Sequence, residues 1–262
     1  MASRHRTIFT ANNTRSVFFI ILVVLAVLSI VHMDLRPMRL VRGVPNLWTL
    51  FGDAVPPDIT LANAALVALF ETVEIAFLGT IFGALIALPL ALLASRNLFR
   101  KRFTTPARII LAAVRTMPSL LLALVFVIMV GPGPFAGVLA TALYSIGYLG
   151  KLHYEAIEGI HPSPLEALSG IGTSRLQLIR FVVLPEAANT LLSQLLFMFE
   201  YNIRASSILG FVGAGGIGFY IMGYMRLLQY DKVLTLLLVL FVVVLVIDYI
   251  STKVRDKYLL WK

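Results

Sequence analysis

Long apolar runs separated by short basic segments limit how this chain can fold. The run from about Asn63 to Ala94 contains two charged side chains, Glu71 and Glu74, and exceeds the roughly 20 residues that a helix needs to cross a bilayer. The run from Ser16 to Met33 is also long enough to span. With 59% hydrophobic and 13% charged residues, the 262-residue chain is too apolar for an average soluble domain. We therefore expect an all-α integral membrane protein.

The apolar runs and the turn signals between them predict six transmembrane helices. They begin near residues 16, 63, 109, 135, 185 and 232. Of the 22 Lys and Arg residues, 15 then fall on one side and five on the other, so the basic side is cytosolic and both termini lie there. Residues 1–62 would form an N-terminal transmembrane helix and an external loop, with a short interfacial helix near Asn46 to Phe51. Residues 63–262 would form the core, with a cytosolic loop at 151–184.

Glycine and proline give further detail within the predicted spans. Gly79 and Gly83 form a Gly-x-x-x-Gly step, which lets a second helix approach closely. Pro118 should interrupt the third span, at a site facing other helices. Glu71 and Glu74 are interpreted as interfacial or bundle-facing carboxylates rather than a proton relay.

The most informative polar segment runs from Ser163 to Pro185. Ser163 with Glu166 and Ser174 with Gln177 each have the spacing of a helix-starting capping box, and Gly172 lies between them. We expect two short helices joined by an elbow, with a single apolar stripe formed by Leu165, Leu168, Gly172, Leu176 and Ile179. Such a hairpin can dock on a protein partner or lie on its own bundle.

Residues in this segment resemble the Glu-Ala-Ala loop of permease subunits in binding-protein-dependent ABC importers. Glu166, Ala167, Gly172, Leu184 and Pro185 have the spacing of that motif, while Leu168 and Val182 are mild departures from it. The resemblance implies a type I importer permease fold and a coupling loop that contacts a cytosolic ATPase subunit. It implies that ATP and Mg are bound by that partner, with no cofactor in this chain.

The fifth predicted helix carries an unusual number of polar residues. Arg204 within a span costs at least about 2.5 kcal/mol unless it is paired or hydrated. Glu200 lies one turn earlier, so the two could form a neutral structural pair. Alternatively, Arg204 could line a substrate pathway for an anion together with other polar residues, namely Asn202, Ser206, Ser207, Glu200 and, from the third span, Arg115.

Several other signals exclude classes of chemistry. Gly213-x-Gly215-x-x-Gly218 matches a dinucleotide fingerprint but lacks the strand and acidic residue that the fingerprint requires. The chain has no P-loop motif, so an ATPase must be another chain, and its four scattered histidines indicate no metal site. The net charge of +9 is attributed to contact with anionic lipid, not with nucleic acid. No Cys is present.

Two further segments resemble the phosphonate branch of these permeases: Glu200 to Gly218, and Arg115 to Pro118. The resemblance implies a homodimeric permease in a bacterial cytoplasmic membrane, working with two ATPase subunits and an external binding protein. Its solute would be a phosphonate, phosphite or a related oxyanion. The alternative is the same machine for another solute, such as methionine or taurine. A membrane transferase would need a cluster of acids, and the sequence contains none.

Overall fold

The structure, a computed structural model, describes residues 6–33 and 37–259, and these ranges contain helices but no strand. The chain divides into two units, residues 1–53 and 54–262. The all-α prediction is thereby confirmed. The predicted assignment of residues 1–62 to an N-terminal region and 63–262 to a permease core stays a prediction.

The first unit consists of α1 (Arg6–His32) and most of α2 (Pro37–Ala54). The apolar side chains that α1 carries from Ser16 onward are exposed, as a helix that faces lipid requires. The helix expected near Asn46 to Phe51 is present but longer than predicted, because α2 spans 18 residues. Its apolar residues recur at three- and four-residue steps, which favours a continuous amphipathic helix.

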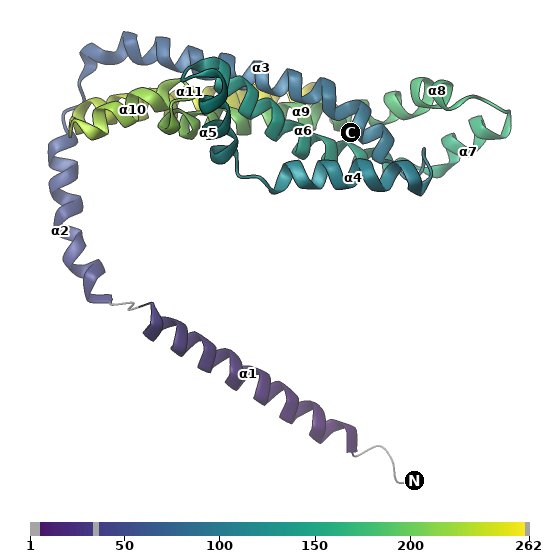
Figure 1. The fold of residues 1–262 in the computed structure, drawn as a ribbon, viewed down its shortest axis with the longest axis horizontal. Helices are drawn as coiled ribbons and strands as arrows, with labels where there is room; N and C mark the ends of the chain where they lie inside the picture. The colour runs from purple at the N-terminus through teal and green to yellow at the C-terminus, as the bar shows by residue number, and fades with distance from the viewer. Residues whose placement is uncertain (1–5, 34–36, 260–262) are drawn as a thin grey trace. The chain divides into compact units, whose positions relative to one another are not determined.

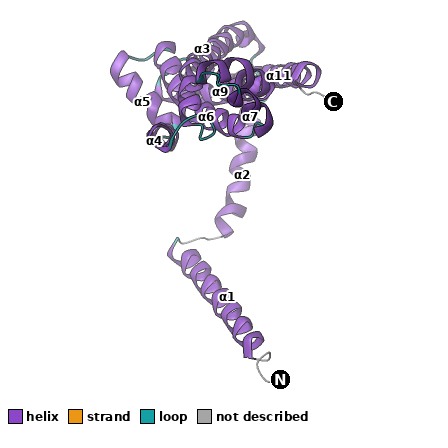
Figure 2. Ribbon diagram, turned by 90° about the vertical axis from the view of Figure 1, so that its right-hand side faces the viewer, coloured by secondary structure: helices purple, strands orange, loops and turns teal. Residues whose placement is uncertain are grey.

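The described part of the second unit begins with a short 3₁₀ turn, η1 (Ile59–Leu61), and then contains nine α-helices. The helices are α3 (Ala62–Ala94), α4 (Lys101–Thr116), α5 (Ser119–Val130), α6 (Pro134–Glu158), α7 (Pro162–Gly170), α8 (Arg175–Leu178), α9 (Leu184–Leu209), α10 (Ile217–Arg226) and α11 (Tyr230–Val254). In Figure 1, α7 and α8 lie at one end of this unit and α10 at the other. Figure 2 shows α3, α6 and α9 gathered in its centre.

Close packing of α3 against α6 forms much of the core. A Cβ atom added at Gly79 would overlap the side chain of Thr141, and one added at Gly83 would overlap that of Ser145. Both partners lie on α6, so the predicted close approach at the Gly-x-x-x-Gly step is confirmed. Buried side chains of α9, among them Met198, complete this core.

Pro118 breaks the third predicted span sharply, because α4 and α5 meet there at a bend of 86°. The interruption was expected, but the start of α4 at Lys101 was not. The basic residues before Ile109 were interpreted as a loop. Basic side chains limit how far a helix can enter a membrane, but they do not stop the helix itself.

Four helical segments are long and apolar enough to cross a membrane, at residues 59–94, 134–158, 175–212 and 230–257, and the bent pair of α4 and α5 makes up to five. These counts apply to the described residues. The total of six spans, with α1 included, stays a prediction. α6 also continues to Glu158 instead of ending near Gly150.

Candidate functional site

The expected coupling loop is present as two helices joined by an elbow. α7 ends at Gly170 and α8 begins at Arg175. Between them, Gly172 has a φ of +78°, a left-handed conformation that glycine adopts without steric cost. The predicted helix–elbow–helix arrangement is confirmed.

The two predicted capping boxes have different outcomes. The Ser174 hydroxyl oxygen accepts from the Gln177 N–H at 3.4 Å, and Gln177 Oε1 accepts from the Ser174 N–H at 2.8 Å, as predicted. The box at Ser163 is wrong, because α7 starts earlier and His161 is its cap. Pro162 suits the first helical position, which needs no N–H donor, and the His161 ring accepts from the Ser163 N–H instead.

One side of the loop is packed and the other is open. Leu165 and Ile179 pack on a buried cluster that includes Ile157 and Val183. Leu176, predicted to share their stripe, is 75% exposed, so the single stripe is not formed. Glu166, Ala167 and Gly172 are exposed, as is Pro185 in the first turn of α9, whereas Leu184 is half-buried. The loop therefore offers a mixed polar and apolar surface to a partner.

Glu158, which the sequence analysis missed, fixes the base of this loop. Its Oε1 accepts from the Arg96 N–H at 2.6 Å and pairs with the Arg108 guanidinium. The Arg108 Nε donates to the Ala94 carbonyl at 2.9 Å, and the side-chain amide of Asn97 donates to the Ile157 carbonyl at 2.8 Å. These contacts tie the ends of α3 and α6 to the middle of α4. Its partners lie 50 and 62 residues away, so no local pattern indicated these contacts.

Asn202 is the centre of a buried polar node between three helices. Its Nδ2 donates to Thr80 Oγ1 of α3 and to Ser145 Oγ of α6, both at 2.8 Å. Asn202 Oδ1 and Ser206 Oγ are buried without a partner among the described residues. Such groups are rare in packed interiors. Ser207 is also buried and its hydroxyl donates to the Ile203 carbonyl.

The possible Glu200–Arg204 pair is not formed. Glu200 is 5% exposed and accepts instead from Arg255, which follows α11, with 3.0 Å between Arg255 Nη2 and Glu200 Oε1. Arg204 is exposed and lies on the other side of α9 from Asn202 and Ser206, next to a small cleft lined by Val244 and Ile247 of α11. Sequence spacing could not reveal Arg255, because that partner is 55 residues away.

Arg115 is half-buried on α4, beside a small cleft that it shares with Arg108, Lys151 and Tyr154. None of these neighbours belongs to the polar set of α9. The structure therefore brings Asn202, Ser206 and Ser207 together on one helix and leaves Arg115 and Arg204 at separate places.

Three tyrosines form a stacked cluster beside the polar node, which sequence reasoning also missed. The hydroxyls of Tyr144 and Tyr201 are 2.8 Å apart, and their rings stack with centroids 5.6 Å apart. Tyr148 lies against both and is 38% exposed. Tyr144 and Tyr148 are one helical turn apart on α6, and that spacing was the available signal.

The glycine-rich segment after α9 is a tight junction, not a nucleotide loop. It follows η3 (Gly210–Val212), a 3₁₀ turn at the end of α9, instead of a strand. The first N–H groups of α10 are occupied by α3, since the Gly216 N–H donates to Glu71 at 2.9 Å and the Ile217 N–H donates to Thr72 at 2.8 Å. Glu71 is thus the bundle-facing carboxylate that the sequence predicted. Rejection of the dinucleotide fingerprint agrees with this geometry.

Within residues 6–33 and 37–259, no group of three or more His, Asp or Glu side chains is placed to hold a metal ion. The arrangement thus combines a helical membrane bundle, an exposed elbow at one end and buried polar groups in the middle. These features define a membrane transport subunit.

The chain belongs to the family described as binding-protein-dependent transport system inner membrane component, which matches residues 79–258. It is 40% identical over 218 residues to HtxC, a transport system permease protein of Stutzerimonas stutzeri, covering 83% of this chain and 77% of HtxC. It is 36% identical to the phosphite transport system permease protein PtxC of the same species, covering 84% of this chain and 80% of PtxC.

Among solved structures, the fold is similar to an inward-facing form of the MetNI methionine ABC transporter. The TM-score is 0.69 at 21% identity, over 76% of this chain and 98% of that chain. The predicted type I ABC importer permease fold and the multi-pass inner-membrane location are confirmed. The expectation of a permease rather than an enzyme agrees with the names of the relatives.

Proposed function

We propose that this chain is the transmembrane subunit of an ATP-driven importer for phosphonate, phosphite or a related phosphorus oxyanion. The observation that carries the proposal is the similarity to a phosphite permease across 84% of the chain. A phosphate-import permease, PhnE of Mycolicibacterium smegmatis, is also 35% identical over 90% of this chain, which spans 45% of PhnE. Both relatives are named for oxyanions of phosphorus.

The importer would contain two copies of this chain, two cytosolic ATPase subunits and an external binding protein. Each ATPase, holding ATP and Mg, would contact the exposed elbow that contains Glu166, Ala167 and Gly172. The opposite side of the elbow packs on the helix bundle, and the chain then enters α9 at Leu184 and Pro185. Closure of the ATPase pair would then move the helices from an inward-facing to an outward-facing state. The excess of Lys and Arg in the segments on this side supports a cytosolic position for the elbow and for both termini.

The substrate pathway is proposed to involve the polar residues of α9, with Arg115 from α4. Asn202, Ser206 and Ser207 supply buried hydrogen-bonding groups, two of which lack partners in this conformation. Glu200 serves the pathway indirectly, by holding Arg255. Arg204 and Arg115 have guanidinium groups that can bind an oxyanion where the second copy or a moving helix completes the site.

Uptake into proteoliposomes tests this function. The permease is reconstituted with its ATPase and binding protein, and labelled methylphosphonate, phosphite and phosphate are supplied on the binding-protein side. ATP-dependent uptake of a phosphorus oxyanion is the expected result. ATP hydrolysis stimulated by the binding protein, but no uptake of any of the three, would move the assignment to another solute such as methionine or taurine.

Arg204→Gln separates transport from assembly within the same assay. Arg204 makes no hydrogen bond or ion pair with another described residue, so the isolated chain should fold normally without it. Uptake should fall while the yield of intact complex is kept. Loss of the complex with normal uptake per assembled complex would remove Arg204 from the pathway.

A further inference from the structure

A cavity of about 430 Å³ lies between α5, η3 and α10. This volume is within the usual range of about 300–1,000 Å³ for small-molecule sites. Four of its lining residues belong to α10, and α10 lies at the end of the unit opposite α7 and α8 (Figure 1). The four are Phe219, Met222, Gly223 and Arg226. With the elbow in the cytosol, as the proposed function has it, the residues that line the cavity on η3 and α10 lie toward the external side.

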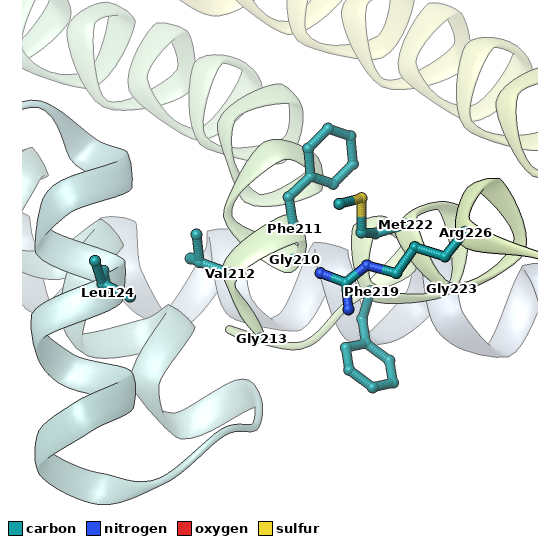
Figure 3. Close-up of a pocket in the computed structure, with 9 residues that line it drawn as sticks. All are labelled: Leu124, Gly210, Phe211, Val212, Gly213, Phe219, Met222, Gly223 and Arg226. Carbon is teal, nitrogen blue, oxygen red and sulfur yellow. The ribbon is translucent and has the colours of Figure 1, made fainter.

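The cavity contains one charged group in an otherwise apolar lining. Leu124 of α5 and Phe211 and Val212 of η3 form one wall, and Phe219 and Met222 of α10 form the other. Figure 3 shows the Arg226 side chain extending back along α10 so that its guanidinium lies over the space between these walls. An apolar surrounding strengthens the attraction between a guanidinium and an anion.

Arg226 is exposed, and no contact with another described residue holds its guanidinium in this place. It lies in the last turn of α10, where a cation could stabilise the free carbonyls of the helix end. Its side chain points toward the N-terminal end of α10, as long side chains of helices usually do, and this direction carries the guanidinium over the cavity (Figure 3). It makes no ion pair, hydrogen bond or ring contact with another residue of the described chain, so its donors are available.

We propose that this cavity is a solute site on the outer side of the permease, where Arg226 binds the oxyanion and the apolar walls receive an organic substituent. The inference rests on the proposed function and narrows its solute class to organophosphonates. A phosphonate has one end that needs charged donors and one end that needs none. Inorganic phosphate or phosphite would leave most of the apolar wall without a ligand group to contact.

The first test compares transport per ATP hydrolysed in Arg226→Gln, Arg226→Lys and wild-type proteoliposomes. Stimulation of ATP hydrolysis by the binding protein reports docking and coupling, so it should stay within about twofold of wild type. Methylphosphonate imported per ATP should fall about tenfold in Arg226→Gln, the effect of losing one charged hydrogen bond, and less in Arg226→Lys. Lys232→Gln, which removes a cation of α11 outside the cavity, should not change the ratio.

The second test fills the cavity. Gly223 lines it, and a Cβ atom added there meets nothing within 4 Å, so Gly223→Leu can be accommodated by the fold. Uptake of ethylphosphonate relative to phosphite should fall about tenfold in this variant, because the added side chain occupies space for the ethyl group. The same binding protein delivers ethylphosphonate and phosphite, so the ratio of their uptake is independent of docking.

The outcomes distinguish three explanations. If wild-type proteoliposomes import no phosphorus oxyanion, the proposed function fails. If they do, but Arg226→Gln and Gly223→Leu leave both ratios unchanged, the cavity is not a solute site. In the third outcome, Arg226→Gln lowers the import of all solutes equally, and only in vesicles that contain phosphatidylglycerol, not in those of pure phosphatidylcholine. That result would assign Arg226 to a lipid headgroup and overturn the proposal.

Discussion

The turn between α7 and α8 and the turn between α9 and α10 both depend on glycine, but for different physical reasons. Before α9, Gly172 has a positive φ and no atom within 4 Å of where a Cβ would lie. After α9, a Cβ at Gly218 would overlap the Ser207 carbonyl, and one at Gly215 would lie 2.7 Å from Glu71 Oε1. The first turn is an open elbow fixed by backbone conformation, and the second is a junction fixed by packing. Substitutions can therefore separate coupling from folding.

The largest effect on folding is expected for Gly218→Ala. The added methyl would overlap backbone atoms that cannot rotate away, so we expect a loss of about 3 kcal/mol or a failure to fold. Gly223→Ala is the matched control on α10, since its Cβ position is open. The measurement is thermal unfolding of the purified protein in detergent. Equal melting temperatures for the two variants would show that the junction is not tightly packed.

The elbow could be predicted from sequence because its signals are local. Ser174, Gln177 and Gly172 lie within six residues, and each acts on backbone groups nearby. The close approach of a helix at Gly79 and Gly83 could be predicted for the same reason, because close helix packing needs small residues at that spacing. Even so, the cap at His161 was missed, since two neighbouring prolines offered two possible helix starts.

The junction after α9 could not be predicted, because its contacts join residues far apart in the chain. Glu71 reaches Gly216 across 145 residues, and Arg255 reaches Glu200 across 55. The one-turn spacing in the sequence predicted Arg204 as a possible partner of Glu200, but Glu200 pairs with the distant Arg255 instead. The cavity at Arg226 likewise exists only once α5 and α10 are brought together.

Glu71→Leu sharpens the comparison by testing the polar contacts of the junction. It leaves the Gly216 N–H, which Glu71 accepts from at 2.9 Å, without a partner, at a cost of about 2 kcal/mol. Glu74→Leu is the control, because Glu74 is exposed and makes no such contact. Both changes remove one acid from α3. If thermal unfolding shows the same stability for the two variants, Glu71 does not hold the start of α10.

Gly172→Ala should have a smaller effect on stability and a clear one on coupling. Alanine at a φ of +78° costs about 1 kcal/mol, because its Cβ crowds the backbone. Gly170→Ala, which adds a methyl in open space at the end of α7, is the control. Thermal unfolding and ATP hydrolysed per solute imported are measured for both. Indistinguishable values would mean that the elbow does not need glycine.

Glu166→Lys is expected to change stability least, by under about 0.5 kcal/mol, because the Glu166 side chain is exposed on α7 and makes no hydrogen bond or ion pair with another described residue. If the elbow contacts an ATPase, the reversed charge should raise the ATP hydrolysed per solute imported without altering the yield of folded permease. Glu186→Lys makes the same charge change on α9, outside the elbow, and should import normally. Equal import by both variants would show that the surface of α7 does not transmit ATPase closure, leaving the exposed side of α8 as the part of the elbow that does.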